Sequence, residues 1–78
     1  MNSPFLSKRA EKFLERQPSK DGARILRAIH KMPEGDVRPI QGRPGEFRLR
    51  IGDWRIIFEY RGQEIFVKEI GNRGDVYK

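Results

Sequence analysis

The sequence predicts an α+β domain in which two N-terminal helices pack on a small antiparallel β-sheet. Two observations support this fold class. Up to Met32, apolar residues recur every three or four positions, as on one face of a helix. From Asp36 onward the period is two, with β-branched and aromatic residues between glycines and prolines. With 78 residues, the chain is expected to form a single domain over residues 1–78.

The first helix is expected over residues 7–16. Ser7 is the expected N-cap, because a serine side chain accepts a hydrogen bond from an otherwise unpaired N–H of the first turn. Pro18 ends the helix, since the residue before a proline is displaced from the α region. Charged residues occupy the outward face. The buried face is expected to consist of Ala10, Phe13 and Leu14.

A second helix is expected from Ser19, as its N-cap, to about Met32. The short connection and the two apolar stripes together predict a helical hairpin that lies on one face of the rest of the domain. The stripe of the second helix is expected to contain Ile25, Leu26, Ala28 and Ile29.

Four strands are expected after the helices, with loops at the segments QGRPG, GD and RG. The N-terminal Pro4 to Leu6 is a candidate remnant of a further strand, at an edge of the sheet because proline cannot donate to the ladder. The four main strands are expected over residues 37–40, 46–51, 54–60 and 64–70.

The segment GEFRLRIGDWRIIFEY carries most of the information about a functional surface. If Gly52 and Asp53 form a two-residue hairpin loop, antiparallel counting places Arg50 opposite Arg55 and Arg48 opposite Ile57. The apolar face of this hairpin then consists of Phe47, Leu49, Ile51, Trp54, Ile56 and Phe58.

The other face of the hairpin carries Arg48, Arg50 and Arg55, and a following turn at Arg61-Gly62 would add Lys68 opposite Arg55. That turn would also pair Phe58 with Ile65 and Ile56 with Val67. Like charges so close together are unfavourable unless an anion lies between them. We therefore expect a polyanion site, the alternative being that the arginines extend into solvent or pair with Glu46, Glu59 and Asp75.

Composition favours a polyanionic partner and excludes several kinds of chemistry. Seventeen Lys and Arg against eleven Asp and Glu give a formal charge of +6 and a pI near 10.2. No cysteine is present, which excludes disulfides, thiolate metal sites and thiol catalysis. The single histidine, His30, excludes a ribonuclease with two catalytic histidines. We expect no metal or other cofactor, no membrane span, and a cytoplasmic protein.

The remaining candidate chemistry is phosphate chemistry with cations and a phenol. In RNA, the 2′-OH can attack the adjacent phosphorus if the site supplies a base, positive charge for the phosphorane and help for the leaving 5′-oxygen. Tyr77 is a candidate base, because neighbouring cations favour the phenolate, and Arg73 is a candidate for the leaving oxygen. Such a site predicts slow cleavage of free RNA and faster cleavage when a larger assembly aligns the strand.

The runs AEKFLE, RPIQG, FRLRIGDWRIIFEY and RGDVY resemble the RelE/ParE superfamily of type II toxin-antitoxin toxins over nearly the whole chain. The resemblance implies two helices against a curved antiparallel sheet, the RelE-like fold, and an antitoxin encoded beside the toxin. In ribosome-dependent members of this superfamily, basic strand residues and a C-terminal Arg and Tyr act on mRNA. By resemblance, the catalytic residues are Arg48, Arg55, Arg73 and Tyr77, with Arg50 and Lys68 as RNA-binding neighbours.

Two departures from the superfamily pattern concern MNSPFL, which represents the usual first strand poorly, and Glu46, where some ribonuclease members carry a lysine. The function we expect is a ribosome-dependent mRNA endoribonuclease that inhibits translation, with the ribosome, mRNA and an acidic, partly disordered antitoxin as partners. The alternatives are a ParE-like inhibitor of DNA gyrase and a non-catalytic module that binds RNA or an antitoxin.

Overall fold

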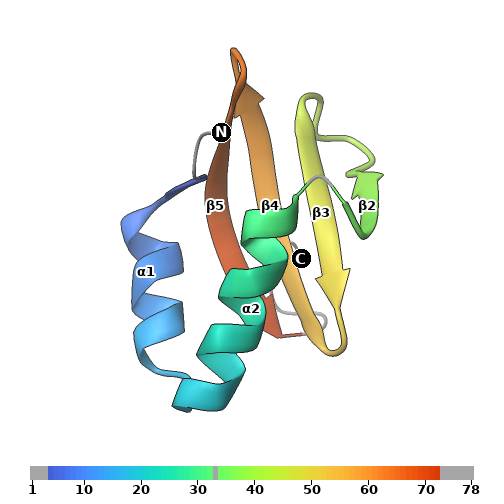
Figure 1. Cartoon of the computed structure of the whole chain (residues 1–78). Helices are drawn as coiled ribbons and strands as arrows, with labels where there is room; N and C mark the ends of the chain where they lie inside the picture. The colour runs from blue at the N-terminus through green and yellow to red at the C-terminus, as the bar shows by residue number, and fades with distance from the viewer. Residues whose placement is uncertain (1–3, 33, 73–78) are drawn as a thin grey trace.

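The computed structural model describes residues 4–32 and 34–72, which form a sheet with two helices on one of its faces (Figure 1). Figure 1 shows α2 in front of the strands and α1 at the left, next to β5. None of the helices in these residues is long and apolar enough to cross a membrane. In chain order the elements are β1 (Phe5–Leu6), α1 (Lys8–Glu15), α2 (Ser19–Lys31), β2 (Asp36–Pro39), β3 (Glu46–Ile51), β4 (Trp54–Arg61) and β5 (Glu64–Asn72).

The sheet has five strands in the order β1-β5-β4-β3-β2, and it is mixed rather than purely antiparallel. The expected antiparallel meander is present in β2 to β5. The N-terminal remnant strand also exists, as the two-residue β1, but it pairs with β5 in parallel.

The helices begin and end close to the expected positions. Ser7 is the N-cap of α1, as predicted, and its Oγ accepts a hydrogen bond of 3.1 Å from the Ala10 N–H. The same hydroxyl donates to the Lys68 carbonyl at 2.6 Å and so ties the start of α1 to β5. The prediction for Ser19 was wrong, since it is the first helical residue and α2 has Pro18 at the N-cap without a side-chain cap.

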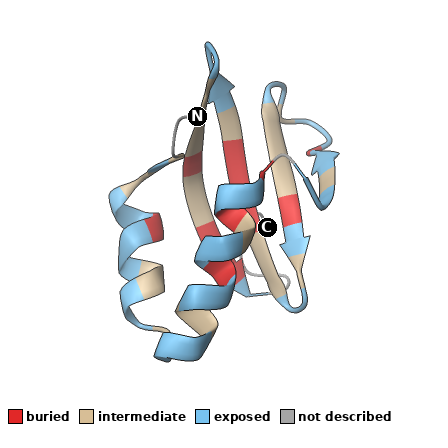
Figure 2. Ribbon diagram, viewed as in Figure 1, coloured by how far each residue is buried: buried red, intermediate tan, exposed pale blue. Residues whose placement is uncertain are grey.

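The core lies between the helices and the facing side of β3, β4 and β5, where the buried segments in Figure 2 are concentrated. Leu26 departs from the expected stripe of α2, because it is 37% exposed while Ile25 and Ile29 are buried. The buried members of the core are Ala10, Ile25, Ile29, Met32, Leu49, Ile56, Phe58, Val67 and Ile70.

The pairing of β3 with β4 matches the sequence prediction at every counted position, including Arg50 with Arg55 and Arg48 with Ile57. The loop is Gly52-Asp53, and Gly52 adopts a φ of 54°, a left-handed conformation that a glycine reaches without strain.

The predicted pairing of β4 with β5 was wrong for two reasons. The turn is Gly62-Gln63 rather than Arg61-Gly62, which moves the register by two, so that Phe58 pairs with Val67. A bulge then separates the Phe58 pair from the next pair, and Ile56 faces Ile70. Lys68 is the additional residue of the bulge, and the Cα partner of Arg55 is Gly71.

Candidate anion-binding face of the sheet

The sheet face opposite the helices carries the candidate site, and we call it the open face. Strand alternation places charged residues of four neighbouring strands on it. Its described members include Asp36 and Arg38 of β2, Glu46, Arg48 and Arg50 of β3, Arg55, Ile57, Glu59 and Arg61 of β4, and Glu64, Phe66, Lys68 and Glu69 of β5.

One end of the open face, next to the β3–β4 turn, is mainly cationic, and Asp36, the carboxylate that faces Arg50 from β2, is bound by Arg38 at 3.4 Å. Arg50 and Arg55 are direct cross-strand partners, with Arg50 exposed and Arg55 half-buried. Neither makes an ion pair within residues 4–32 and 34–72. Two like charges directly opposite each other destabilise a sheet, and an anion between them would remove the repulsion. This end therefore presents two guanidinium groups to an anion from outside the described chain.

Arg48 lies two residues before Arg50 on the same strand and is half-buried. Its Nη1 atom is buried without a hydrogen-bond partner in the described part of the chain. A buried donor of a charged group is costly to leave unpaired. Arg48 thus adds a third guanidinium, with unused hydrogen-bonding capacity, to the site that the sequence predicted.

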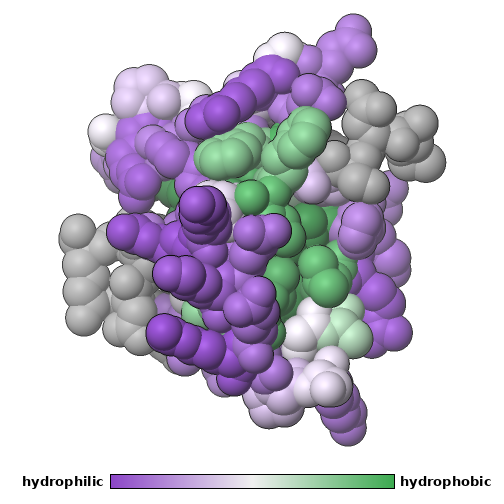
Figure 3. Space-filling model, turned by 90° about the vertical axis from the view of Figure 1, so that its left-hand side faces the viewer, coloured by the Kyte–Doolittle hydropathy of each residue, from purple (hydrophilic) through white to green (hydrophobic). Residues whose placement is uncertain are grey.

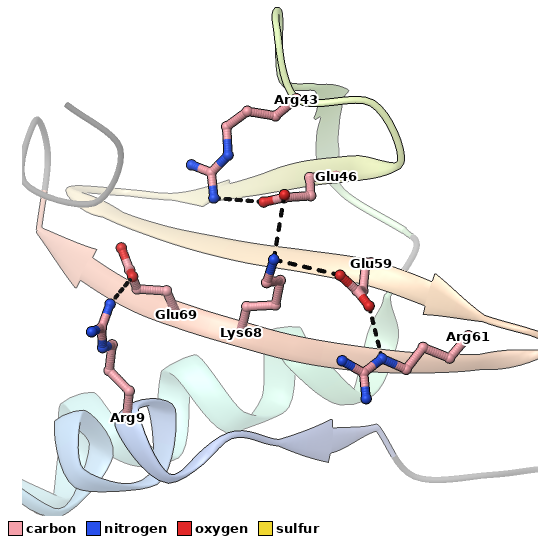
Figure 4. A network of polar contacts seen from close by, with 7 residues as sticks. All are labelled: Arg9, Arg43, Glu46, Glu59, Arg61, Lys68 and Glu69. Atoms are coloured by element: carbon pink, nitrogen blue, oxygen red, sulfur yellow. Dashed lines mark hydrogen bonds and ion pairs between the residues drawn. The ribbon is translucent and has the colours of Figure 1, made fainter.

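The other end of the open face is an ion-pair chain of alternating charges that runs across three strands (Figure 4). Lys68 lies in its middle, with Nζ 3.3 Å from Glu46 Oε2 and 3.5 Å from Glu59 Oε1. The second oxygen of each carboxylate is bound by an arginine, at 2.6 Å for Arg43 and Glu46 and at 2.7 Å for Arg61 and Glu59. We call these five residues, Arg43, Glu46, Lys68, Glu59 and Arg61, the charge chain.

The charge chain corrects two expectations. Lys68 does not extend the arginine cluster opposite Arg55 but is held by carboxylates. Glu46 and Glu59, which were expected to pair with the three arginines if anything did, instead pair with other cations. The β4–β5 turn explains both outcomes, because a turn at Gly62-Gln63 moves Lys68 two positions along β4, away from Arg55 and toward Glu59, and the bulge leaves Lys68 unpaired at that level.

Glu59 is the carboxylate whose titration this environment changes. The hydrogen bond from Arg61 lowers the pKa of Glu59 below its ordinary value of 4.5. The charges of Arg61 and Lys68 act in the same direction, while partial burial opposes them. Glu59 therefore stays ionised in moderately acidic solution and keeps its contact with Lys68.

Ile57 is a feature of this face that the sequence prediction missed. It shares the face with the cations, since its partners are Arg48 and Glu69, yet it is fully buried. It forms a small apolar cluster with Ile40, separate from the main core. The adjacent Ile56 and Ile57 could have signalled this, because an apolar pair in a strand gives one residue to each face.

Two predicted catalytic residues, Arg73 and Tyr77, lie outside the described residues. Of the six predicted site residues, the structure brings Arg48, Arg50, Arg55 and Lys68 onto one face. The residues that the structure describes contain no group of three His, Cys, Asp or Glu side chains that could hold a metal ion.

A separate apolar surface lies at the β1 edge of the sheet. Phe5 is 53% exposed, and a hollow of about 350 Å³ lies between it and the start of β5. Figure 3, viewed from the α1 side, shows apolar side chains at the surface with hydrophilic ones around them. The hollow is lined by Phe5, Leu6, Arg61, Glu64, Ile65 and Phe66.

Comparison with known proteins identifies the family of the chain. Residues 5–77 match the family model described as "ParE toxin of type II toxin-antitoxin system, parDE". A search of curated proteins found no match. The fold is similar to a chain of the RelB-RelE antitoxin-toxin complex from Methanococcus jannaschii, with a TM-score of 0.73 and 23% identity over 87% of this chain and 88% of that chain. It is also similar to a chain of the archaeal RelE-RelB complex from Pyrococcus horikoshii OT3, with a TM-score of 0.70 and 22% identity over 95% and 99% of the two chains.

Proposed function

This chain belongs to the ParE toxin family of type II toxin-antitoxin systems, within the RelE/ParE superfamily. From the charges on its open face, we propose that it is a ribosome-dependent endoribonuclease that cleaves mRNA. The observation that carries the proposal is the cationic end of the open face. Arg50 and Arg55 face each other there without a counter-ion among the described residues, and Arg48 adds an unused buried donor. A phosphodiester supplies the missing anion.

The proposed mechanism assigns the phosphate to the arginines. Arg48 and Arg55 stabilise the negative charge that develops on the phosphorane when the 2′-OH attacks, and Arg50 binds the neighbouring backbone. Guanidinium groups suit this role because each offers a planar fork of donors to phosphate oxygens. Tyr77 accepts the 2′-OH proton, and Arg73 stabilises the leaving 5′-oxygen.

We propose that cleavage depends on the ribosome because the described side chains of the site supply charge rather than a strong base. In-line attack by the 2′-OH requires an aligned strand, and alignment by a larger assembly contributes much of the rate in such reactions. A lysine where Glu46 lies would strengthen phosphate binding, and Glu46 instead neutralises part of the face. We therefore expect little cleavage of free RNA and clear cleavage of ribosome-bound mRNA.

A second candidate is inhibition of DNA gyrase through protein contact, as the resemblance to ParE-like toxins implies. The description of the matching family model favours this candidate. The cationic end of the open face favours the ribonuclease, because a protein contact does not require guanidinium groups aimed at phosphate. The two candidates differ in target, and parallel assays separate them.

We also propose a cognate antitoxin as partner, since both similar structures are chains of RelE-RelB complexes, one of them described as an antitoxin-toxin complex. An acidic, partly disordered chain would complement the formal charge of +6 and fold on binding. The apolar hollow beside Phe5 offers such a chain a place for its apolar side chains.

The test compares the wild type with Arg55→Ala and Tyr77→Phe in a translating extract, with mRNA 5′ ends mapped by primer extension. Arg27→Ala is the matched control, because it removes the same charge from the exposed surface of α2. New ends within ribosome-bound codons, lost in both site variants but kept in the control, would support the ribonuclease. Intact mRNA together with accumulated gyrase-DNA cleavage complexes would favour the second candidate, and neither effect would leave a non-catalytic binding module.

A further inference from the structure

We propose that Glu46 and Glu59 determine the specificity of the open face by holding Lys68 between them, which withdraws this cation from phosphate binding. Binding of RNA is then limited to the arginines near the β3–β4 turn. This inference rests on the proposed function, because it concerns the same RNA-binding face.

The β3–β4 ladder contains two like-charged cross-strand pairs. Glu46 pairs with Glu59 at one end, and Arg50 pairs with Arg55 one position before the other end. Each pair is unfavourable by itself and needs an ion of opposite sign between its members. The chain supplies that ion for the glutamates, since Lys68 Nζ lies within 3.5 Å of both. No described carboxylate forms an ion pair with the arginines, since Asp36, the β2 partner of Arg50, is bound by Arg38 instead, so an external anion is directed to them.

The carboxylates block phosphate binding at Lys68 in two ways. Lys68 Nζ lies near one oxygen of each carboxylate, and the other oxygen forms an ion pair with Arg43 or Arg61, although Glu46 Oε1 is buried without a hydrogen bond among the described residues. A phosphate that approached Lys68 would also meet the two negative charges at short range. The Glu46 and Glu59 side chains are 17% and 24% exposed, so solvent screens this repulsion only in part.

The consequence is a narrow anion site on a strongly basic protein. With Lys68 free, several cations would follow the sheet across three strands, and any polyanion could bind along them. With Lys68 occupied, the cations of the open face without an ion pair, among residues 34–72, are Arg48, Arg50 and Arg55, which suits a strand that another assembly has positioned. Glu46 and Glu59 thus weaken binding to free RNA while leaving the cationic end intact.

The test measures binding of the full chain to a single-stranded 2′-O-methyl RNA oligonucleotide, which lacks the attacking hydroxyl, by fluorescence anisotropy at several salt concentrations. The central variant is Glu46→Gln/Glu59→Gln, which keeps the shape of both side chains. Glu11→Gln/Glu15→Gln is the matched control, because it makes the same change in net charge on the exposed surface of α1. A third variant adds Lys68→Ala to the central one, and thermal unfolding verifies that each variant is folded.

We expect the central variant to bind about tenfold more tightly, as one new charge-assisted contact predicts. Its plot of log affinity against log salt should be steeper by about 0.7, the value for one further phosphate neutralised on a single strand. The added Lys68→Ala should remove both gains. Equal affinities for the central variant and the α1 control would overturn the inference.

Arg48→Ala/Arg55→Ala separates this inference from the proposed function. If this variant loses binding while the central variant gains none, the open face binds RNA and the role of the glutamates is wrong. If it binds like the wild type, the face is not the RNA site, and both proposals fail.

Discussion

The two faces of the sheet contrast in how their side chains are satisfied. The helix-covered face is filled by apolar residues, such as Ile56 and Phe58, that are fully removed from solvent. The open face is held by charges: in the charge chain every carboxylate is paired with cations, whereas the arginine pair has no counter-ion among the described residues. Burial supplies most of the stability of a small domain, whereas partly exposed ion pairs supply little. Substitutions that change the charge of the open face should therefore cost little free energy of unfolding, so this face can carry binding residues without loss of the fold.

Phe58→Ala should have the largest effect, because it removes a fully buried ring that stacks on Phe47 at 5.8 Å. We expect a loss of about 3–5 kcal/mol in the free energy of unfolding. That is a large part of the roughly 4–12 kcal/mol available to a domain of this size. Chemical denaturation measures it, with Phe5→Ala as the exposed control. Similar losses for the two variants would show that the helix-covered face is not the main core.

Ile57→Ala tests whether an apolar residue of the open face also stabilises the fold. Ile57 is fully buried although it belongs to the open face, and it contacts Ile40 rather than the main core. We expect a loss of about 2–4 kcal/mol in unfolding free energy, against about 1 kcal/mol for Ile57→Val. A loss near zero for Ile57→Ala would mean that the open face contributes no apolar stabilisation.

Ser7→Ala tests the connection between the helices and the sheet. The hydroxyl caps α1 and also donates to the Lys68 carbonyl, so its removal leaves two groups without their partner. We expect a loss of about 1–2 kcal/mol. Ser19→Ala is the control, since no side-chain cap is formed at the start of α2. Equal effects of the two substitutions in denaturation would contradict a capping role for Ser7.

The sequence was sufficient for the parts of this contrast that depend on local rules. Strand alternation and a two-residue loop containing Gly52 determine the β3–β4 register, and with it the opposition of Arg50 and Arg55. The helix boundaries followed from Ser7 and Pro18 in the same way. These features each depend on a few neighbouring residues.

The remaining features depend on tertiary structure. Gly62 can stand first or second in a two-residue turn, and that choice moves the β4–β5 register by two. The bulge at Lys68 leaves no signal in the alternation, so neither its contact with Glu46 nor that with Glu59 could be counted from the sequence. The two-residue β1 owes its place to pairing with β5 rather than to its own sequence pattern.

Arg50→Gln should have the smallest effect on stability and an effect of opposite sign. Arg50 faces Arg55 without a counter-ion among the described residues, so removing its charge relieves a repulsion in the folded state. We expect a gain of a few tenths of a kcal/mol at low salt, which added salt should reduce as it screens the wild-type repulsion. Arg27→Gln, on the exposed surface of α2, is the control and should change stability by less. A gain in unfolding free energy together with weaker RNA binding would show that the arginine pair is kept at the expense of stability. A loss of stability would show instead that Arg50 has a structural partner.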